Sequence, residues 1–102
     1  MKQCCKDYLN EQFGGDEDVV KEIYAEYVAS THAKLTEAVA ALAADDWLAL
    51  DRIAHALKGN SLAAGDQELA DTAIALRSSS KLENRSEASM LIDKMKTLVE
   101  ML

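Results

Sequence analysis

The sequence predicts an all-α protein, and three features of its composition and spacing support this. The 102 residues include no proline and only four glycines, the residue types that most disfavour a helix interior. Alanine is abundant, and runs of β-branched residues are short. Apolar residues recur three and four positions apart, which is the spacing of an amphipathic helix. We therefore expect one domain over residues 1–102, an up-down antiparallel four-helix bundle with one or two short N-terminal helices.

The N-terminal part of the chain predicts a short helix followed by longer ones. A brief apolar stripe over residues 6–13 ends at the Gly14-Gly15 pair, which breaks helices. Asp16 is a plausible N-cap for the next segment. The spacing over residues 17–44 is helical, and no glycine or proline forces a break. Whether this segment is one helix or two is open, and we favour two, with a change of direction near Ser30-Thr31.

Three more helices are expected in the remainder of the chain. The Asp45-Asp46 pair can cap the first of them, Gly65 fits its C-terminus, and Asp66 can cap the second. Ser78-Ser79-Ser80 and Asn84-Arg85 mark a polar connection to the last helix. Short links between helices make antiparallel neighbours, which is how an up-down bundle forms.

Charge and composition argue against several classes of partner. The formal net charge is −7 and no basic stripe occurs, so nucleic acid and anionic membrane surfaces are not expected partners. No apolar run approaches the ~18 residues of a spanning helix, and the first residues, Met1-Lys2-Gln3, lack the apolar core that a secretion signal has. We expect a cytoplasmic protein and, because the chain starts with Met and makes one bundle, a free-standing one. The adjacent Cys4 and Cys5 are expected to be reduced thiols, since neighbouring cysteines rarely form a disulfide.

The helix expected over residues 46–64 carries the most informative pattern. With ~100° per residue, Trp47, Ile53, Ala54 and Leu57 fall near Leu50 and form a core face, with Ser61 among them. His55 falls about 140° from Leu50, and Gly59 about 180°. A glycine in mid-helix costs about 1 kcal/mol relative to alanine. Leu48 and Leu62 also face outward, so we expect a partner to dock on this face.

Histidine suits chemistry on such a face. Imidazole titrates near neutrality, so an exposed histidine is in large part a neutral nucleophile. Phosphoryl transfer depends mainly on positioning and on charge neutralisation. Lys58 lies three residues after His55, within reach of a phosphate on it. Gly59 leaves bare backbone above the imidazole, so a partner can approach closely.

The run from His55 to Gly65, HALKGNSLAAG, resembles the motif of histidine phosphotransfer (HPt) domains. That motif has a histidine, a lysine at +3, a glycine at +4, small residues next and a glycine at +10. The resemblance extends over roughly residues 6–100. Two positions depart from the pattern, because Asn60 replaces a usual small residue and Asp66 replaces a usual alanine.

The resemblance implies a four-helix bundle whose His55 accepts a phosphoryl group, with Lys58 steadying it and Gly59 clearing the approach. It implies a phosphorelay carrier without kinase activity, which exchanges phosphate with response-regulator receiver domains and serves a hybrid sensor histidine kinase. No cofactor of its own is implied, and Mg²⁺ is expected on the partner receiver. Leu48, Arg52 and Leu62 are the candidate partner-binding residues of an expected monomer.

Three other interpretations are weighed against this one. The domain could be an adaptor that binds a receiver or kinase without transfer, or an enzyme acting on a small molecule, although one histidine without a second acid or base disfavours the enzyme. Leu48 and Leu62 could instead pack on the first helix or on a dimer partner. His32 lacks the Lys-Gly context and is expected to be a capping or surface residue.

Overall fold

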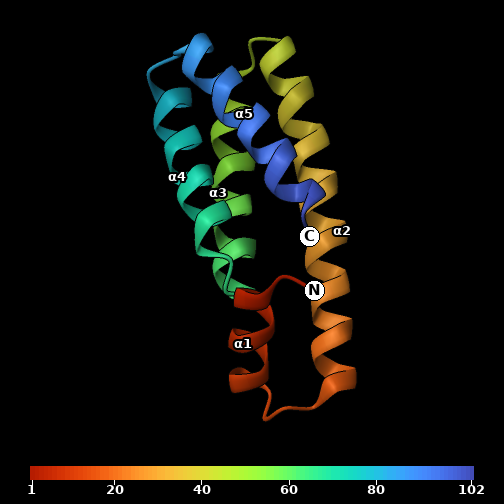
Figure 1. The fold of residues 1–102 in the computed structure, drawn as a ribbon. Helices are drawn as coiled ribbons and strands as arrows, with labels where there is room; N and C mark the ends of the chain where they lie inside the picture. The colour runs from red at the N-terminus through yellow and green to blue at the C-terminus, as the bar shows by residue number, and fades with distance from the viewer.

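The computed structural model describes all 102 residues and contains five helices and no strand. The predicted all-α class is therefore confirmed. The helices, shown in Figure 1, are α1 (Gln3–Gln12), α2 (Glu17–Ala43), α3 (Trp47–Ala63), α4 (Gln67–Lys81) and α5 (Arg85–Glu100).

The four longer helices enclose one hydrophobic core. α2 packs on α3 and α5, and α4 packs on the same two helices. In Figure 1 the chain direction reverses at each link from α2 to α5, while α1 folds back beside the N-terminal half of α2. Leucines from α1, α3 and α4 are fully buried in this core, namely Leu9, Leu50, Leu57, Leu69 and Leu76.

Four of the five helices begin at a residue whose side chain caps them. The carboxylates of Asp16, Asp46 and Asp66 and the amide oxygen of Asn84 each accept a hydrogen bond from the backbone N–H three residues later. Such a cap contributes about 1 kcal/mol to helix stability. The predicted starts at Asp16, at the Asp45-Asp46 pair and at Asp66 are confirmed.

The expected break near Ser30-Thr31 is wrong, because α2 runs unbroken from Glu17 to Ala43. Thr31 is fully buried on the core side of this helix, in line with Tyr27 and Leu35, so it does not cap a new one. Ser30 accepts a hydrogen bond from Asn60 of α3. Both polar residues therefore face other helices from within one continuous helix.

The serine run 78–80 is not the connection that the sequence predicts. These residues form the last turns of α4. The hydroxyls of Ser79 and Ser80 donate to the carbonyls of Ala75 and Leu76, four residues earlier, a bond that allows serine inside a helix. The link is shorter than expected and ends at Asn84, the cap of α5. Similarly, α1 begins at Gln3 instead of residue 6.

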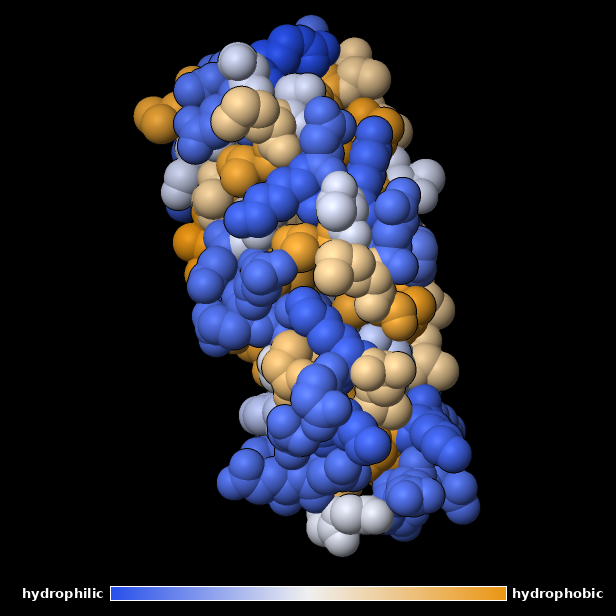
Figure 2. All heavy atoms as spheres, in the orientation of Figure 1, coloured by the Kyte–Doolittle hydropathy of each residue, from blue (hydrophilic) through white to orange (hydrophobic).

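The surface is largely hydrophilic on the side drawn in Figure 2, where apolar residues form small separate groups. No helix combines the length and the hydropathy that a membrane crossing requires.

Candidate functional site

α3 divides into a buried face and an exposed face, as its periodicity predicts. Leu50, Ala54, Leu57 and Ser61 are fully buried, whereas His55 lies exposed on the other side. The hydroxyl of Ser61 donates to the carbonyl of Leu57 at 2.7 Å, which satisfies it within the helix. The helix therefore holds its histidine outward on a well-packed base.

Lys58 lies one turn after His55 and is half-buried. Neither a hydrogen bond nor an ion pair engages its ammonium group. The long, flexible stem of a lysine lets its charged end move over a neighbouring surface. Lys58 is therefore free to approach an anionic group carried by the imidazole.

Gly59 lies in open space beside the histidine. A Cβ atom built at this position meets no heavy atom within 4 Å. The glycine therefore serves no close contact between helices of this chain, and its backbone φ is not in the left-handed region. Because glycine has no side chain, the helix backbone next to His55 is bare and open to an approaching molecule.

The three candidate partner-binding residues are exposed on α3. Leu48 is 62% exposed and Leu62 is 41% exposed, and Arg52 is exposed as well. Neither leucine is among the side chains of the core cluster. Within this chain, the alternative that the two leucines pack on the first helix is wrong.

Arg77 of α4 is a neighbour of His55 that the sequence analysis missed. Its Nη1 lies 3.2 Å from His55 Nδ1, and its Nε donates to Oδ1 of Asp51 at 3.0 Å. Asp51 lies one turn before His55, so the helical spacing alone predicts that the two side chains are neighbours. The position of Arg77 beside His55 was not predictable, because nothing in the sequence gives the register of α4 against α3.

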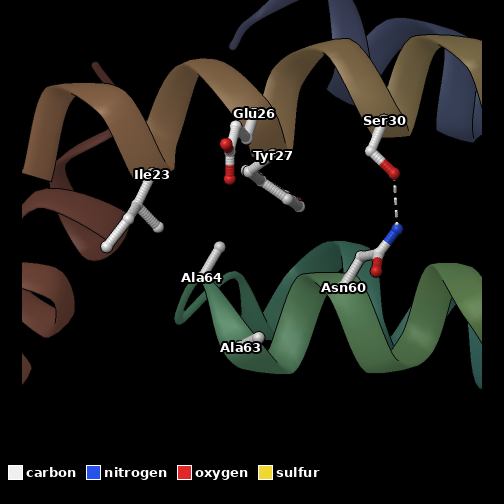
Figure 3. Close-up of a pocket in the computed structure, with 7 residues that line it drawn as sticks. All are labelled: Ile23, Glu26, Tyr27, Ser30, Asn60, Ala63 and Ala64. Atoms are coloured by element: carbon white, nitrogen blue, oxygen red, sulfur yellow. Dashed lines mark hydrogen bonds between the residues drawn. The ribbon is translucent and has the colours of Figure 1, made fainter.

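A shallow groove between α2 and α3 lies apart from the histidine (Figure 3). Its volume is about 300 Å³, and its lining is partly apolar. In Figure 3, Asn60 reaches across to Ser30, and its Nδ2 donates to Ser30 Oγ at 2.9 Å. Asn60, one of the two departures from the motif, thus ties α3 to α2. The residues that line the groove are Ile23, Glu26, Tyr27, Ser30, Asn60, Ala63 and Ala64.

The other departure, Asp66, is a buried carboxylate that joins three segments. It caps α4, accepts a hydrogen bond from the Tyr27 hydroxyl at 2.8 Å and pairs with Lys2 Nζ at 2.7 Å. Burial raises the pKa of Tyr27, and the adjacent carboxylate raises it further. Burial alone lowers the pKa of Lys2, but Asp66 outweighs this effect and the net shift is upward. Asp66 therefore serves the fold, since it is buried just after the end of α3 and is not part of the exposed face of that helix.

Gly65 explains the last position of the motif. Its φ of 74° lies in the left-handed region, which glycine adopts without strain. A Cβ here would also overlap the side chain of Tyr8 in α1. The glycine thus ends α3 and lets α1 pack against this end of the bundle.

His32 and the two cysteines contribute nothing to the exposed face of α3. His32 is an exposed residue inside α2, so the surface interpretation is right and the capping one is wrong. Both cysteines are free thiols, Cys4 exposed and Cys5 buried. Burial, with the charges of Cys4 and Asp66, raises the pKa of Cys5 to about 12, so this thiol is unreactive near neutral pH.

Comparison with protein families gives a match over most of the chain. The family model described as the Hpt domain matches residues 22–102, which is about four fifths of the chain and includes all of α3, α4 and α5. Comparisons with curated proteins and with solved structures give no significant match. Hpt domains carry phosphoryl groups on histidine in phosphorelays and are not kinases. The chain therefore belongs to the Hpt domain family.

Proposed function

We propose that this domain accepts a phosphoryl group on His55 from the aspartate of one receiver domain and passes it to the aspartate of another. One observation carries the proposal: His55 is exposed in the middle of α3, and one turn after it come an unpaired lysine and a glycine with open space around it. His32 is also exposed, but it lacks both neighbours.

Each neighbour has a separate task in the proposed transfer. The His55 imidazole attacks phosphorus, the bond from phosphorus to the donor's carboxylate oxygen breaks, and the carboxylate leaves. Lys58 places a positive charge beside the phosphoryl oxygens, where a charge-assisted hydrogen bond is strong. Gly59 allows the donor's active site to come within bonding distance of the imidazole.

The partner provides the remaining chemistry in this proposal. Mg²⁺ bound by the receiver domain neutralises charge on the phosphoryl group, so the domain needs no cofactor of its own. A hybrid sensor histidine kinase, through its receiver, is the proposed first donor. The proposal also takes the domain to be a cytoplasmic monomer, with α2 to α5 as an up-down antiparallel four-helix bundle and α1 as an added N-terminal helix.

Phosphorylation by a receiver donor tests the proposal. The domain is mixed with a receiver carrying ³²P on its aspartate, and label on the domain is followed over time. We expect label that is lost in acid and kept in base, as for phosphohistidine. His55→Gln should abolish it, and His32→Gln, the matched control, should leave it unchanged. Full labelling of His55→Gln would refute the assignment of His55.

Docking on the exposed face is tested separately from the chemistry. Leu48→Glu and Leu62→Glu put charge on this face, and we expect each to slow labelling strongly without loss of helical content. Met90→Glu is the control, because Met90 is 67% exposed on α5, away from His55. Wild-type binding to receivers without any transfer would instead indicate an adaptor. Equal rates in all three variants would place the docking surface elsewhere.

A further inference from the structure

The guanidinium of Arg77 bridges two side chains of α3 that lie one turn apart. Its Nε donates to Asp51 Oδ1 at 3.0 Å and its Nη1 lies 3.2 Å from His55 Nδ1. The side chains of Arg77 and Asp51 are 34% and 23% exposed, so this pair is partly shielded from water. Asp51 thereby holds the arginine in position beside the imidazole.

The contact determines which ring nitrogen of His55 carries a proton. Arginine has five N–H donors, no acceptor, and stays charged in proteins. The hydrogen bond can therefore form only when Nδ1 has a free lone pair. In the neutral ring the proton must then lie on Nε2. No other side chain of the protein forms a hydrogen bond with this histidine.

We propose that Arg77 is a positioning residue that keeps Nδ1 of the phosphorylated His55 free of a proton and so prolongs the lifetime of the phosphohistidine. The inference rests on the proposed function, because it requires a phosphoryl group on His55. That group is bound to Nε2, the nitrogen that Arg77 leaves uncovered. For Nε2 to attack phosphorus, the docking receiver must first displace Arg77, so that the ring proton moves through solvent from Nε2 to Nδ1 and frees the Nε2 lone pair. After the transfer, Nδ1 loses this proton to solvent and Arg77 returns to it.

Protonation of Nδ1 controls how easily the bond between phosphorus and Nε2 breaks. In hydrolysis, water attacks phosphorus, and the electron pair of that bond returns to Nε2. If Nδ1 carries a proton, the leaving group is a neutral imidazole. If Nδ1 is bare, the leaving group is an imidazolate, which is much less stable in water. A cation held at Nδ1 opposes its protonation and so slows hydrolysis.

Transfer to a receiver follows the same scheme, with an aspartate carboxylate in place of water. Arg77 must therefore release Nδ1 to a proton for transfer, and docking of the receiver is the event that can displace it. The charged groups around the imidazole are Asp51, Arg52 and Lys58 on α3 and Arg77 on α4. Of these groups, only Arg77 forms a hydrogen bond with a ring nitrogen of His55.

The lifetime of the phosphohistidine at several pH values tests the inference. Wild type, Arg77→Ala and Arg77→Gln are phosphorylated with a labelled receiver, separated from it, and followed at pH 6, 7, 8 and 9. We expect a half-life roughly fivefold shorter at pH 7 in both variants, which is about 1 kcal/mol in activation free energy. The difference should shrink towards pH 9, where Nδ1 is unprotonated in every variant.

Further variants separate this role from a structural one. Arg77→Lys keeps a cation and should retain part of the effect. Asp51→Asn loosens the arginine and should shorten the half-life less than Arg77→Ala does. Arg85→Ala is the matched control, since Arg85 pairs with Asp45 on the link before α3 and should leave the half-life unchanged.

The outcomes distinguish this inference from the proposed function. Failure of the wild type to take up label refutes the proposed function. Normal labelling with equal half-lives in wild type, Arg77→Ala and Arg77→Gln refutes the role of Arg77 alone. A shortening that is the same at pH 6 and pH 9 also refutes it, because an effect through Nδ1 depends on pH.

Discussion

Replacing Gly59 by glutamine should separate the stability of the fold from access to His55. Gly59 lies inside α3, four residues before its end, and a Cβ there meets no atom within 4 Å. A side chain at this position therefore points into solvent without steric cost. It also occupies the space that an incoming active site needs above the imidazole.

The expected gain in stability follows from helix propensity. Glycine is about 0.8–1.0 kcal/mol less favourable than alanine in a helix, and glutamine is only slightly less favourable than alanine. Gly59→Gln should then raise the free energy of unfolding by about 0.5–1 kcal/mol. For a domain of this size the melting temperature should rise by roughly 2–5 °C.

Two assays on the same preparation check this prediction. Thermal unfolding followed by circular dichroism should show the rise in melting temperature, while the rate of labelling by a phosphorylated receiver should fall at least tenfold. Ser89→Gln, an exposed position on α5, is the control that adds the same side chain away from His55. Destabilisation of Gly59→Gln would show that Gly59 is a packing residue, and an unchanged rate would show that access does not depend on it.

Other predictions concern the part of the fold around α1. Gly65→Ala should lower the free energy of unfolding by about 2–4 kcal/mol, because it combines a positive φ with a steric overlap. Gly14→Ala, where φ is 64° but the space is open, should lower it by only about 1–2 kcal/mol. Equal melting temperatures for the two variants would contradict this difference. Tyr27→Phe leaves a buried carboxylate with one partner fewer and should lower the free energy of unfolding by about 1–3 kcal/mol in urea titrations. Iodoacetamide at pH 8 should modify Cys4 and spare the buried Cys5. The folded state raises the pKa of Cys5 from 9.0 to about 12, so the thiol of the unfolded chain loses its proton at lower pH than that of the folded chain. The free energy of unfolding should therefore fall as the pH rises through this window. A free energy of unfolding that stays constant from pH 9 to 11 would refute the raised pKa of Cys5.

The exposed face of α3 was predictable from the sequence because it depends on one helix alone. The periodicity around Leu50 fixes which side faces the core, and His55 and Gly59 then fall on the other side wherever the neighbouring helices lie. Helix starts were predictable for a similar reason, since capping is an interaction between residues three apart.

Features that depend on contacts between helices were not predictable. Ser30 and Thr31 suggested a break in α2, but each faces another helix and the backbone continues. No motif singles out Arg77 in the sequence, and only the packing of α4 on α3 brings it to the imidazole. Asp66 looked like a simple cap, yet it also pairs with Lys2, sixty-four residues away.

A pulse and chase between two receivers tests the central claim most directly. The domain is labelled by a first phosphorylated receiver, freed from it, and mixed with a second, unlabelled receiver and Mg²⁺. If His55 carries the phosphoryl group between proteins, label leaves the wild-type domain and appears on the aspartate of the second receiver, and His55→Gln passes none. Transfer between the receivers that is equally fast with His55→Gln, or label that stays on the wild-type domain with every receiver tried, would contradict the claim.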